Sequence, residues 1–132
     1  MSKTVFLLLL FSVDSLIRLF LFHQNIKMKQ INVQELKKMI DDQVDFQLID
    51  CREQNEYNQC NIHGTLIPMN EIPARFEEIM KDKPVVVQCR SGMRSASVIQ
   101  FLEQNYGYTN LANLEGGILD WIRQIDSSLP AY

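Results

Sequence analysis

The chain has 132 residues, a net charge of −3 and 46% hydrophobic residues, which predicts one domain that can bury a core without disulfide bonds. The acidic balance gives no indication of a nucleic-acid partner. The three cysteines are an odd number and show neither a CxxC pair nor zinc-ligand spacing with the two histidines, so we expect reduced thiols, a cytoplasmic location, no metal and no cofactor.

The first 27 residues differ in composition from the rest of the chain. Residues 5–13 are strongly apolar and residues 16–22 nearly continue them, although one acidic and one basic residue interrupt the run. The segment has no small-x-small cleavage site, which counts against a signal peptide. Its two charged residues would make insertion as a membrane anchor costly. We favour a gene-model extension upstream of a true start at Met28, with the anchor second. The domain is expected over residues 28–132. Contact with a membrane, or export, is expected only if residues 5–22 act as an anchor or a signal.

From residue 28 onward, apolar stretches alternate with amphipathic ones, which indicates alternating strands and helices. The strands are expected at 31–33, 46–50, 66–68, 85–88 and 110–114. The helices are expected from Asn32 to Asp42, at 53–57, 70–80 and 96–104, and from Gly116-Gly117 onward.

Several residues predict where these helices begin and end. Asn32 and Glu35 form a capping-box pattern, and Gly107 suits a left-handed helix end. Asn70 is expected to cap the third helix, with Pro73 tolerated in its first turn. The inward-facing residues of that helix are expected to be Ile72, Phe76, Ile79 and Met80.

The alternation predicts an α/β domain with a central parallel sheet of about five strands and helices on both faces. In such sheets, ligands bind at the carboxyl ends of the strands. Cys89 follows one predicted strand, and Asp50, Cys51 and Arg52 end another, so these residues are expected at one edge.

The run Cys89-Arg-Ser-Gly-Met-Arg-Ser95 lies between a buried strand and a helix. Inward-pointing backbone N–H groups, the helix N-terminus and two arginines would all favour a thiolate at Cys89. A core cysteine beside an ordinary loop is the alternative, but it does not explain the glycine and the two arginines. We therefore predict Cys89 as a nucleophile. The predicted anion-binding residues are Arg90, Ser91, Gly92, Met93, Arg94 and Ser95, with Gly92 curling the backbone and Ser95 also suited to cap the helix.

Other polar residues near this edge are assigned structural roles. Asp50 and Arg52 are expected to form a structural ion pair near the site. Cys51 and Cys60 are expected to be bystanders, with a resolving role as the less favoured alternative. His63 is expected to be solvated, and Trp121 to pack in the core.

Three ordered motifs carry a family resemblance over about residues 30 to 126. They are Leu48-Ile-Asp-Cys-Arg-Glu53 with Glu56-Tyr57, the loop 89–95, and Leu114-Glu-Gly-Gly117 with Trp121. Together they resemble the signatures of single-domain rhodaneses. This resemblance implies a rhodanese-like three-layer α/β domain and a sulfurtransferase, whose loop cysteine takes a sulfane sulfur from a donor such as thiosulfate. The cysteine then holds it as a persulfide and passes it to a thiol or cyanide.

The resemblance also implies partners. The donor is expected to be a small anion, thiosulfate or mercaptopyruvate, and the acceptor cyanide, glutathione, thioredoxin or a sulfur-carrier protein. At Asn61 the sequence departs from the commonest family pattern, which has histidine there. The variant ending Leu66-Ile-Pro68 is similar to rhodanese domains that act with sulfur-carrier adenylyltransferases, which implies sulfur relay as a possible role.

Two other classes stay open. Phosphatases and arsenate reductases of this fold place an arginine six positions after the cysteine, whereas Arg94 is the fifth residue after Cys89 and Ser95 the sixth. The tighter loop suits one sulfur atom better than a phosphate. A non-catalytic binding module is the second alternative, although such domains usually lack the nucleophile.

Overall fold

The computed structural model describes Val13, residues 15–17 and residues 27–132. The choice among signal peptide, anchor and extension concerns residues 1–27, most of which lie outside the described residues. Within the described part of the chain, no helix combines the length and the hydropathy needed to cross a membrane.

Five short strands form one sheet in which every neighbouring pair is parallel. They are β1 (Gln30–Ile31), β2 (Gln47–Asp50), β3 (Thr65–Leu66), β4 (Val85–Gln88) and β5 (Leu111–Leu114). Their spatial order is β1-β5-β4-β2-β3, so β4 lies in the middle with β2 and β5 beside it. The expected α/β domain with a five-stranded parallel sheet is confirmed.

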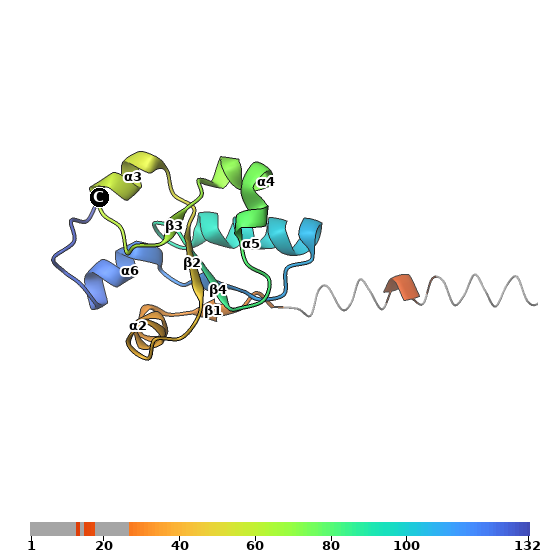
Figure 1. The fold of residues 1–132 in the computed structure, drawn as a ribbon, viewed down its shortest axis with the longest axis horizontal. Helices are drawn as coiled ribbons and strands as arrows, with labels where there is room; N and C mark the ends of the chain where they lie inside the picture. Colours follow the sequence, from red (N-terminus) through yellow and green to blue (C-terminus); the bar gives the residue numbers. More distant parts are fainter. Residues whose placement is uncertain (1–12, 14, 18–26) are drawn as a thin grey trace, which may run out of the picture.

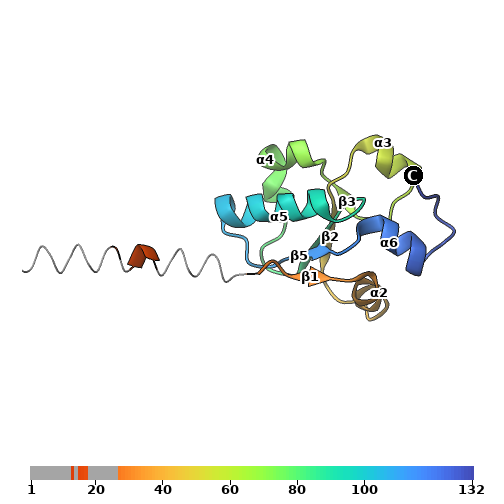
Figure 2. The same cartoon turned by 180° about the vertical axis from the view of Figure 1, so that it is seen from behind.

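Helices cover both faces of this sheet (Figures 1 and 2). On one face, α2 (Val33–Asp41) and α6 (Gly117–Gln124) contact each other over a core that contains Leu36, Val86 and Ile118. On the other face, α5 (Met93–Tyr106) packs on β4 and β5. Because alternate residues of a strand point to opposite faces, β4 supplies Val86 to the first core and its neighbours to the second.

Local signals explain where some helices begin and end. The side chain of Asn32 accepts a hydrogen bond from the Glu35 N–H at 2.8 Å, and the Glu35 carboxylate accepts one from the Asn32 N–H at 2.7 Å. The predicted capping box of α2 is therefore present. Gly107 ends α5 with a φ of 67°, as expected for a left-handed helix end.

The predicted helix 70–80 is wrong, because the chain forms three short turns instead. They are η1 (Met69–Glu71), α4 (Ile72–Arg75) and η2 (Phe76–Glu78). Pro73 lacks the N–H that an α-helix would bond to the carbonyl oxygen of Met69, and that oxygen instead accepts from Ile72 in a tighter turn.

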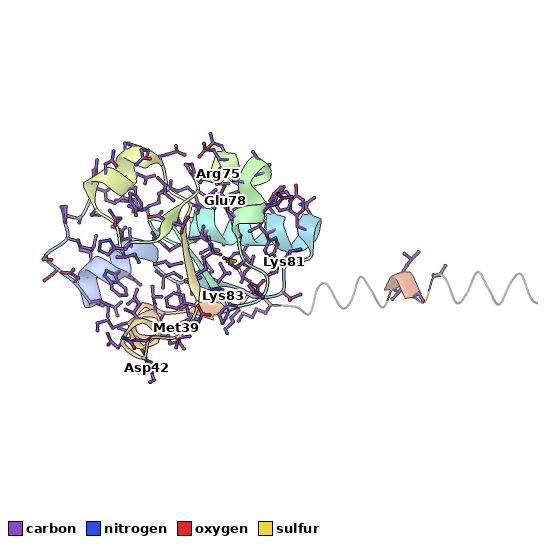
Figure 3. All side chains as sticks on the ribbon, viewed as in Figure 1. Met39, Asp42, Arg75, Glu78, Lys81 and Lys83 are labelled. Atoms are coloured by element: carbon purple, nitrogen blue, oxygen red, sulfur yellow. The ribbon has the colours of Figure 1, made fainter. Side chains whose placement is uncertain are left out.

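This irregular segment still buries, fully or in part, most of the residues that were expected to face inward. Ile72 and Ile79 are buried as predicted, and Phe76 packs against the same core, but Met80 is 44% exposed. Arg75 forms ion pairs with Glu78 at 2.7 Å and Glu71 at 3.2 Å (Arg75 and Glu78 are labelled in Figure 3).

Candidate active site

Two cysteines lie side by side at the carboxyl edge of the sheet. Cys89 directly follows β4, and Cys51 directly follows β2, its parallel neighbour. The last ladder pair is Asp50 with Gln88, and the Cys51 N–H continues the ladder to the Gln88 carbonyl oxygen at 3.0 Å. Both thiols belong to the core on the α5 face, with exposed fractions of 0% for Cys51 and 1% for Cys89.

The loop between β4 and α5 directs hydrogen-bond donors at the Cys89 sulfur. The Gly92 N–H donates to Sγ at 3.1 Å, and the Ser95 hydroxyl lies 3.3 Å from it. Gly92 has a φ of 102°, a left-handed conformation that glycine adopts at little cost. The N-terminus of α5 therefore faces the sulfur and favours a negative charge there.

The position of Ser95 differs from its predicted role as a helix cap. The helix begins at Met93, so Gly92 occupies the cap and Ser95 is buried within the first turn. The Ser95 hydroxyl also approaches the Oδ1 atom of Asn113 at 2.5 Å. Its single proton thus lies between a neutral amide oxygen and the sulfur, and an ionised sulfur competes more strongly for it than a neutral one.

The first turn of helix α6 donates hydrogen bonds to the carbonyl oxygens of the same loop. The N–H groups of Ile118 and Leu119 donate to the carbonyl oxygens of Cys89 at 2.9 Å and Arg90 at 3.2 Å. This contact requires close approach at Gly117, where an added Cβ would lie 2.4 Å from the Cys89 oxygen. Because the carbonyl groups are bound on that side, the loop can turn its N–H groups toward the sulfur.

We expect Gly117→Ala to disturb the cysteine loop more than its backbone strain alone explains. Gly107→Ala is the matched control, because Gly107 also has a positive φ but an added Cβ meets nothing within 4 Å. Both variants incur left-handed strain of about 1–2 kcal/mol. Gly117→Ala should lose about 1–3 kcal/mol more through overpacking, measured by urea unfolding. Its Cys89 should also alkylate more slowly than in Gly107→Ala, and equal rates and stabilities would contradict this account.

The surroundings lower the pKa of the Cys89 thiol to about 4. The largest cause is a hydrogen bond from the Cys51 thiol; burial opposes the shift, and the Ser95 hydroxyl and the N–H groups of Ser95 and Gly92 support it. The same hydrogen bond, together with burial and the charge of Cys89, raises the pKa of Cys51 far above its usual range. Both directions favour a negative charge on Cys89, toward which the Gly92 N–H and the Ser95 hydroxyl point.

The Cys51 proton has two acceptors within reach. Its thiol lies 3.4 Å from the Gln88 carbonyl oxygen, and the neighbouring strand ends bring the Cys89 sulfur into the same core. An anionic sulfur is a stronger acceptor than a carbonyl oxygen, so ionisation of Cys89 draws the proton toward it.

The two loop arginines have other partners in the structure. Arg94 forms a two-armed ion pair with Glu56, with both N···O distances at 2.8 Å. This pairing lowers the pKa of Glu56 to about 2, and the charge of Cys89 contributes to the raised pKa of Arg94. Arg90 is exposed and donates from Nε to the backbone oxygen of Tyr132 at 2.9 Å. Both cations therefore lie around the site, and neither donates a hydrogen bond to the sulfur.

The exposed loop residues Arg90, Ser91 and Met93 form the rim of the site, and the predicted ion pair lies outside the loop. Ser91 is exposed, and Met93 is 78% exposed, so both lie at the surface around the loop. Asp50 and Arg52 form the expected ion pair at 2.7 Å, fully buried. His63 is exposed, as expected.

Trp121 and Cys60 both belong to the core on the face of α2 and α6, so the expected core packing of Trp121 is confirmed. Cys60 lies on the opposite face from the two site thiols. It is therefore a natural control for experiments on Cys51 and Cys89.

Sequence reasoning gave no role at Cys89 to Glu56, Asn113 and Gly117, and it favoured a bystander role for Cys51 although it placed that residue at the same sheet edge. The doubled glycine 116–117 was a visible signal, since such pairs mark close backbone approach. Asn113 carried no comparable signal. Its amide donates to the Gly92 carbonyl oxygen at 3.0 Å, a contact between residues 21 positions apart.

Two hollows of the molecule do not include Cys89 in their lining. One of about 1060 Å³ is lined by residues that include Met39, Lys81 and Lys83 (labelled in Figure 3), and a second of about 570 Å³ is lined by His63 and Trp121 among others. Among the residues that the structure describes, no cluster of three potential metal ligands is present. Cys89 is only 1% exposed, so its sulfur is almost fully covered.

The fold and the site define an α/β domain with a buried cysteine at the N-terminus of a helix. The family model for the rhodanese-like domain matches residues 32–124, and the chain belongs to this family. A sulfurtransferase from Allochromatium vinosum is 41% identical over 95 residues, which are 71% of this chain and 88% of that protein. The crystal structure of a rhodanese-like domain protein from Staphylococcus aureus is 33% identical, with a TM-score of 0.65, and the match covers 71% of this chain and 91% of that chain. A Bacillus subtilis protein named as a candidate sulfur carrier, YrkF, is 27% identical over 93 residues, 70% of this chain and 50% of that protein.

Proposed function

We propose that this protein is a sulfurtransferase in which Cys89 carries the sulfur as a persulfide between a small anionic donor, such as thiosulfate, and a thiol or cyanide. The family and its sulfurtransferase-named relatives support sulfur transfer in general. The observation that carries the persulfide step is the pair of donors at the Cys89 sulfur, the Gly92 N–H at 3.1 Å and the Ser95 hydroxyl at 3.3 Å, which help to lower the pKa of this thiol to about 4. At neutral pH this thiol is a thiolate, which is the nucleophilic form.

The first half-reaction loads the sulfur. The Cys89 thiolate attacks the sulfane sulfur of thiosulfate, a new S–S bond forms, and the old S–S bond breaks with its electron pair leaving on sulfite. Positive charge near the departing anion assists this step. Arg90 is the better placed cation, because it is exposed and its contact with Tyr132 can be exchanged for the donor, whereas Arg94 is held by Glu56.

The second half-reaction passes the sulfur on. An acceptor thiolate or cyanide attacks the outer sulfur of the persulfide, and the Cys89 thiolate leaves. A thiol of low pKa is a good leaving group, so the same hydrogen bonds that prepare Cys89 for loading also assist unloading. The likeness to YrkF, named as a candidate sulfur carrier, favours a protein thiol among the possible acceptors.

Thiocyanate formation from thiosulfate and cyanide tests this proposal. We expect activity in the unaltered chain, none in Cys89→Ser and full activity in Cys60→Ser, whose thiol lies on the opposite face of the sheet. Activity that survives in Cys89→Ser would contradict the proposal. Hydrolysis of an aryl phosphate that is lost in Cys89→Ser would favour the phosphatase alternative instead.

A further inference from the structure

We propose that Cys51 is a resolving thiol, which attacks the Cys89 persulfide, forms a Cys51–Cys89 disulfide and releases the transferred sulfur as hydrosulfide. The inference rests on the proposed persulfide and gives it a second outcome besides transfer to an external acceptor. It starts from the position of two buried thiols on neighbouring strands.

The backbone places the two sulfurs within bonding reach. Cys51 and Cys89 each stand one residue beyond the last ladder pair of β2 and β4. Paired strands lie about 4.8 Å apart, and disulfides join residues whose Cα atoms are about 4.4–6.8 Å apart. Both side chains belong to the same buried core, and the Cys51 thiol donates to the carbonyl oxygen of Gln88, the residue before Cys89, at 3.4 Å. A disulfide therefore requires side-chain rotation and no movement of the strands.

The hydrogen-bond donors around the Cys89 sulfur do not occupy the side from which Cys51 would attack. The Gly92 N–H and the Ser95 hydroxyl approach the sulfur from the loop and the first turn of α5, whereas Cys51 approaches it from the neighbouring strand. A donor must enter at the rim, so the outer sulfur of the persulfide extends toward the rim. Cys51 can then attack the inner sulfur on the side away from the departing atom, as thiol–disulfide exchange requires.

The step balances without an external oxidant. The Cys51 thiol and the anionic persulfide Cys89–S–S⁻ give the disulfide and HS⁻. The new bond joins the two Sγ atoms, and the bond between the Cys89 sulfur and the outer sulfur breaks with its electron pair on the outer sulfur. The Cys51 proton moves to that sulfur. The outer sulfur is reduced to sulfide while the two cysteines are oxidised, and a dithiol of the thioredoxin class would restore both thiols by exchange.

Burial of Cys51 makes this reaction specific to the loaded state. Its raised pKa keeps Cys51 protonated in the resting protein, so it is a poor nucleophile toward external reagents. In the persulfide, the negative charge moves from the Cys89 sulfur to the outer sulfur, which can accept the Cys51 proton as it leaves. Cys60 cannot substitute, because it belongs to the core on the other face.

A single-turnover experiment without oxygen or reductant tests the inference. The full chain is treated with thiosulfate, and protein mass, released sulfide and cross-linked peptides are measured. The unaltered chain should lose the mass of two hydrogen atoms, release close to one equivalent of sulfide and yield a Cys51–Cys89 cross-link. Cys60→Ser should behave in the same way, and the chain without thiosulfate should show neither change.

Cys51→Ser separates the failure of this inference from the failure of the proposed function. Serine retains a hydrogen-bond donor but cannot form the disulfide, so this variant should gain the mass of one sulfur atom and release no sulfide. If the unaltered chain instead keeps the added sulfur and forms no cross-link, the resolving role is wrong while the persulfide stands. If Cys51→Ser gains no sulfur with thiosulfate, mercaptopyruvate or a persulfide donor, the proposed function itself fails.

Discussion

Cys51→Ala should raise the pKa of the Cys89 thiol from about 4 toward its ordinary range, because the variant removes the largest cause of its depression. Burial of Cys89 persists in the variant and acts in the same direction, since it disfavours the charged form. The hydrogen bonds from Gly92 and Ser95 remain and limit the rise. Cys51→Ser keeps a donor beside the sulfur and should retain a pKa closer to that of the unaltered chain.

The pH dependence of Cys89 alkylation measures this shift. The thiolate is the reactive form, so the rate in the unaltered chain should be constant at neutral pH and fall only as the pH decreases toward about 4. In Cys51→Ala the fall should begin at a higher pH. At alkaline pH, where both proteins are ionised, Cys51→Ala should react faster, because a thiolate of higher pKa is intrinsically more nucleophilic.

This crossing of the two profiles distinguishes a pKa effect from a general loss of reactivity. Mass spectrometry of the alkylated peptides assigns the rate to Cys89 and excludes a contribution from Cys60. Profiles of Cys51→Ala and the unaltered chain that coincide over the whole pH range would show that Cys51 does not stabilise the Cys89 thiolate.

The pairing of Cys51 with Cys89 also shows where sequence reasoning ends. Alternating apolar and amphipathic stretches predict a parallel sheet, and both cysteines can be assigned to strand ends from the sequence alone. Their contact depends on the strand order, in which β2 lies directly beside β4 while β3 lies on the far side of β2. Sequence order does not reveal that crossover, so Cys51 was expected to be a bystander.

The loop arginines illustrate a second limit. Two cations beside a cysteine predict an anion-binding loop, but not which acceptor groups lie opposite them. Arg94 pairs with Glu56 across 38 positions of sequence. Gly92, in contrast, follows from the local chain, because a tight strand-to-helix loop needs a left-handed residue. Local conformational demands were thus readable, whereas long-range charge pairing required the structure.

Asp50→Ala should destabilise the fold by about 3–5 kcal/mol, because it leaves a charged guanidinium buried without its carboxylate. The Asp50 side chain accepts hydrogen bonds from Nε of Arg52 at 2.9 Å and from its Nη2 at 2.7 Å, and both side chains are 0% exposed. Burial tends to lower the pKa of Arg52, but the bonds to Asp50 and Tyr132 raise it above the usual value. Arg52 therefore stays charged and cannot relieve the loss by releasing its proton.

The matched control is Asp45→Ala, which removes an ion pair with Lys83 of similar length, 3.0 Å, from a side chain that is 86% exposed. That change should alter stability by about 1 kcal/mol or less, because water replaces the lost partner. The contrast in urea unfolding tests whether burial, rather than pairing alone, sets the importance of the Asp50 pair. Since Asp50 and Arg52 flank Cys51 in the chain, the pair also fixes the end of β2 that places Cys51 beside the strand end carrying Cys89. A loss equal to that of Asp45→Ala would mean that the pair neither stabilises the domain nor holds that strand end in place.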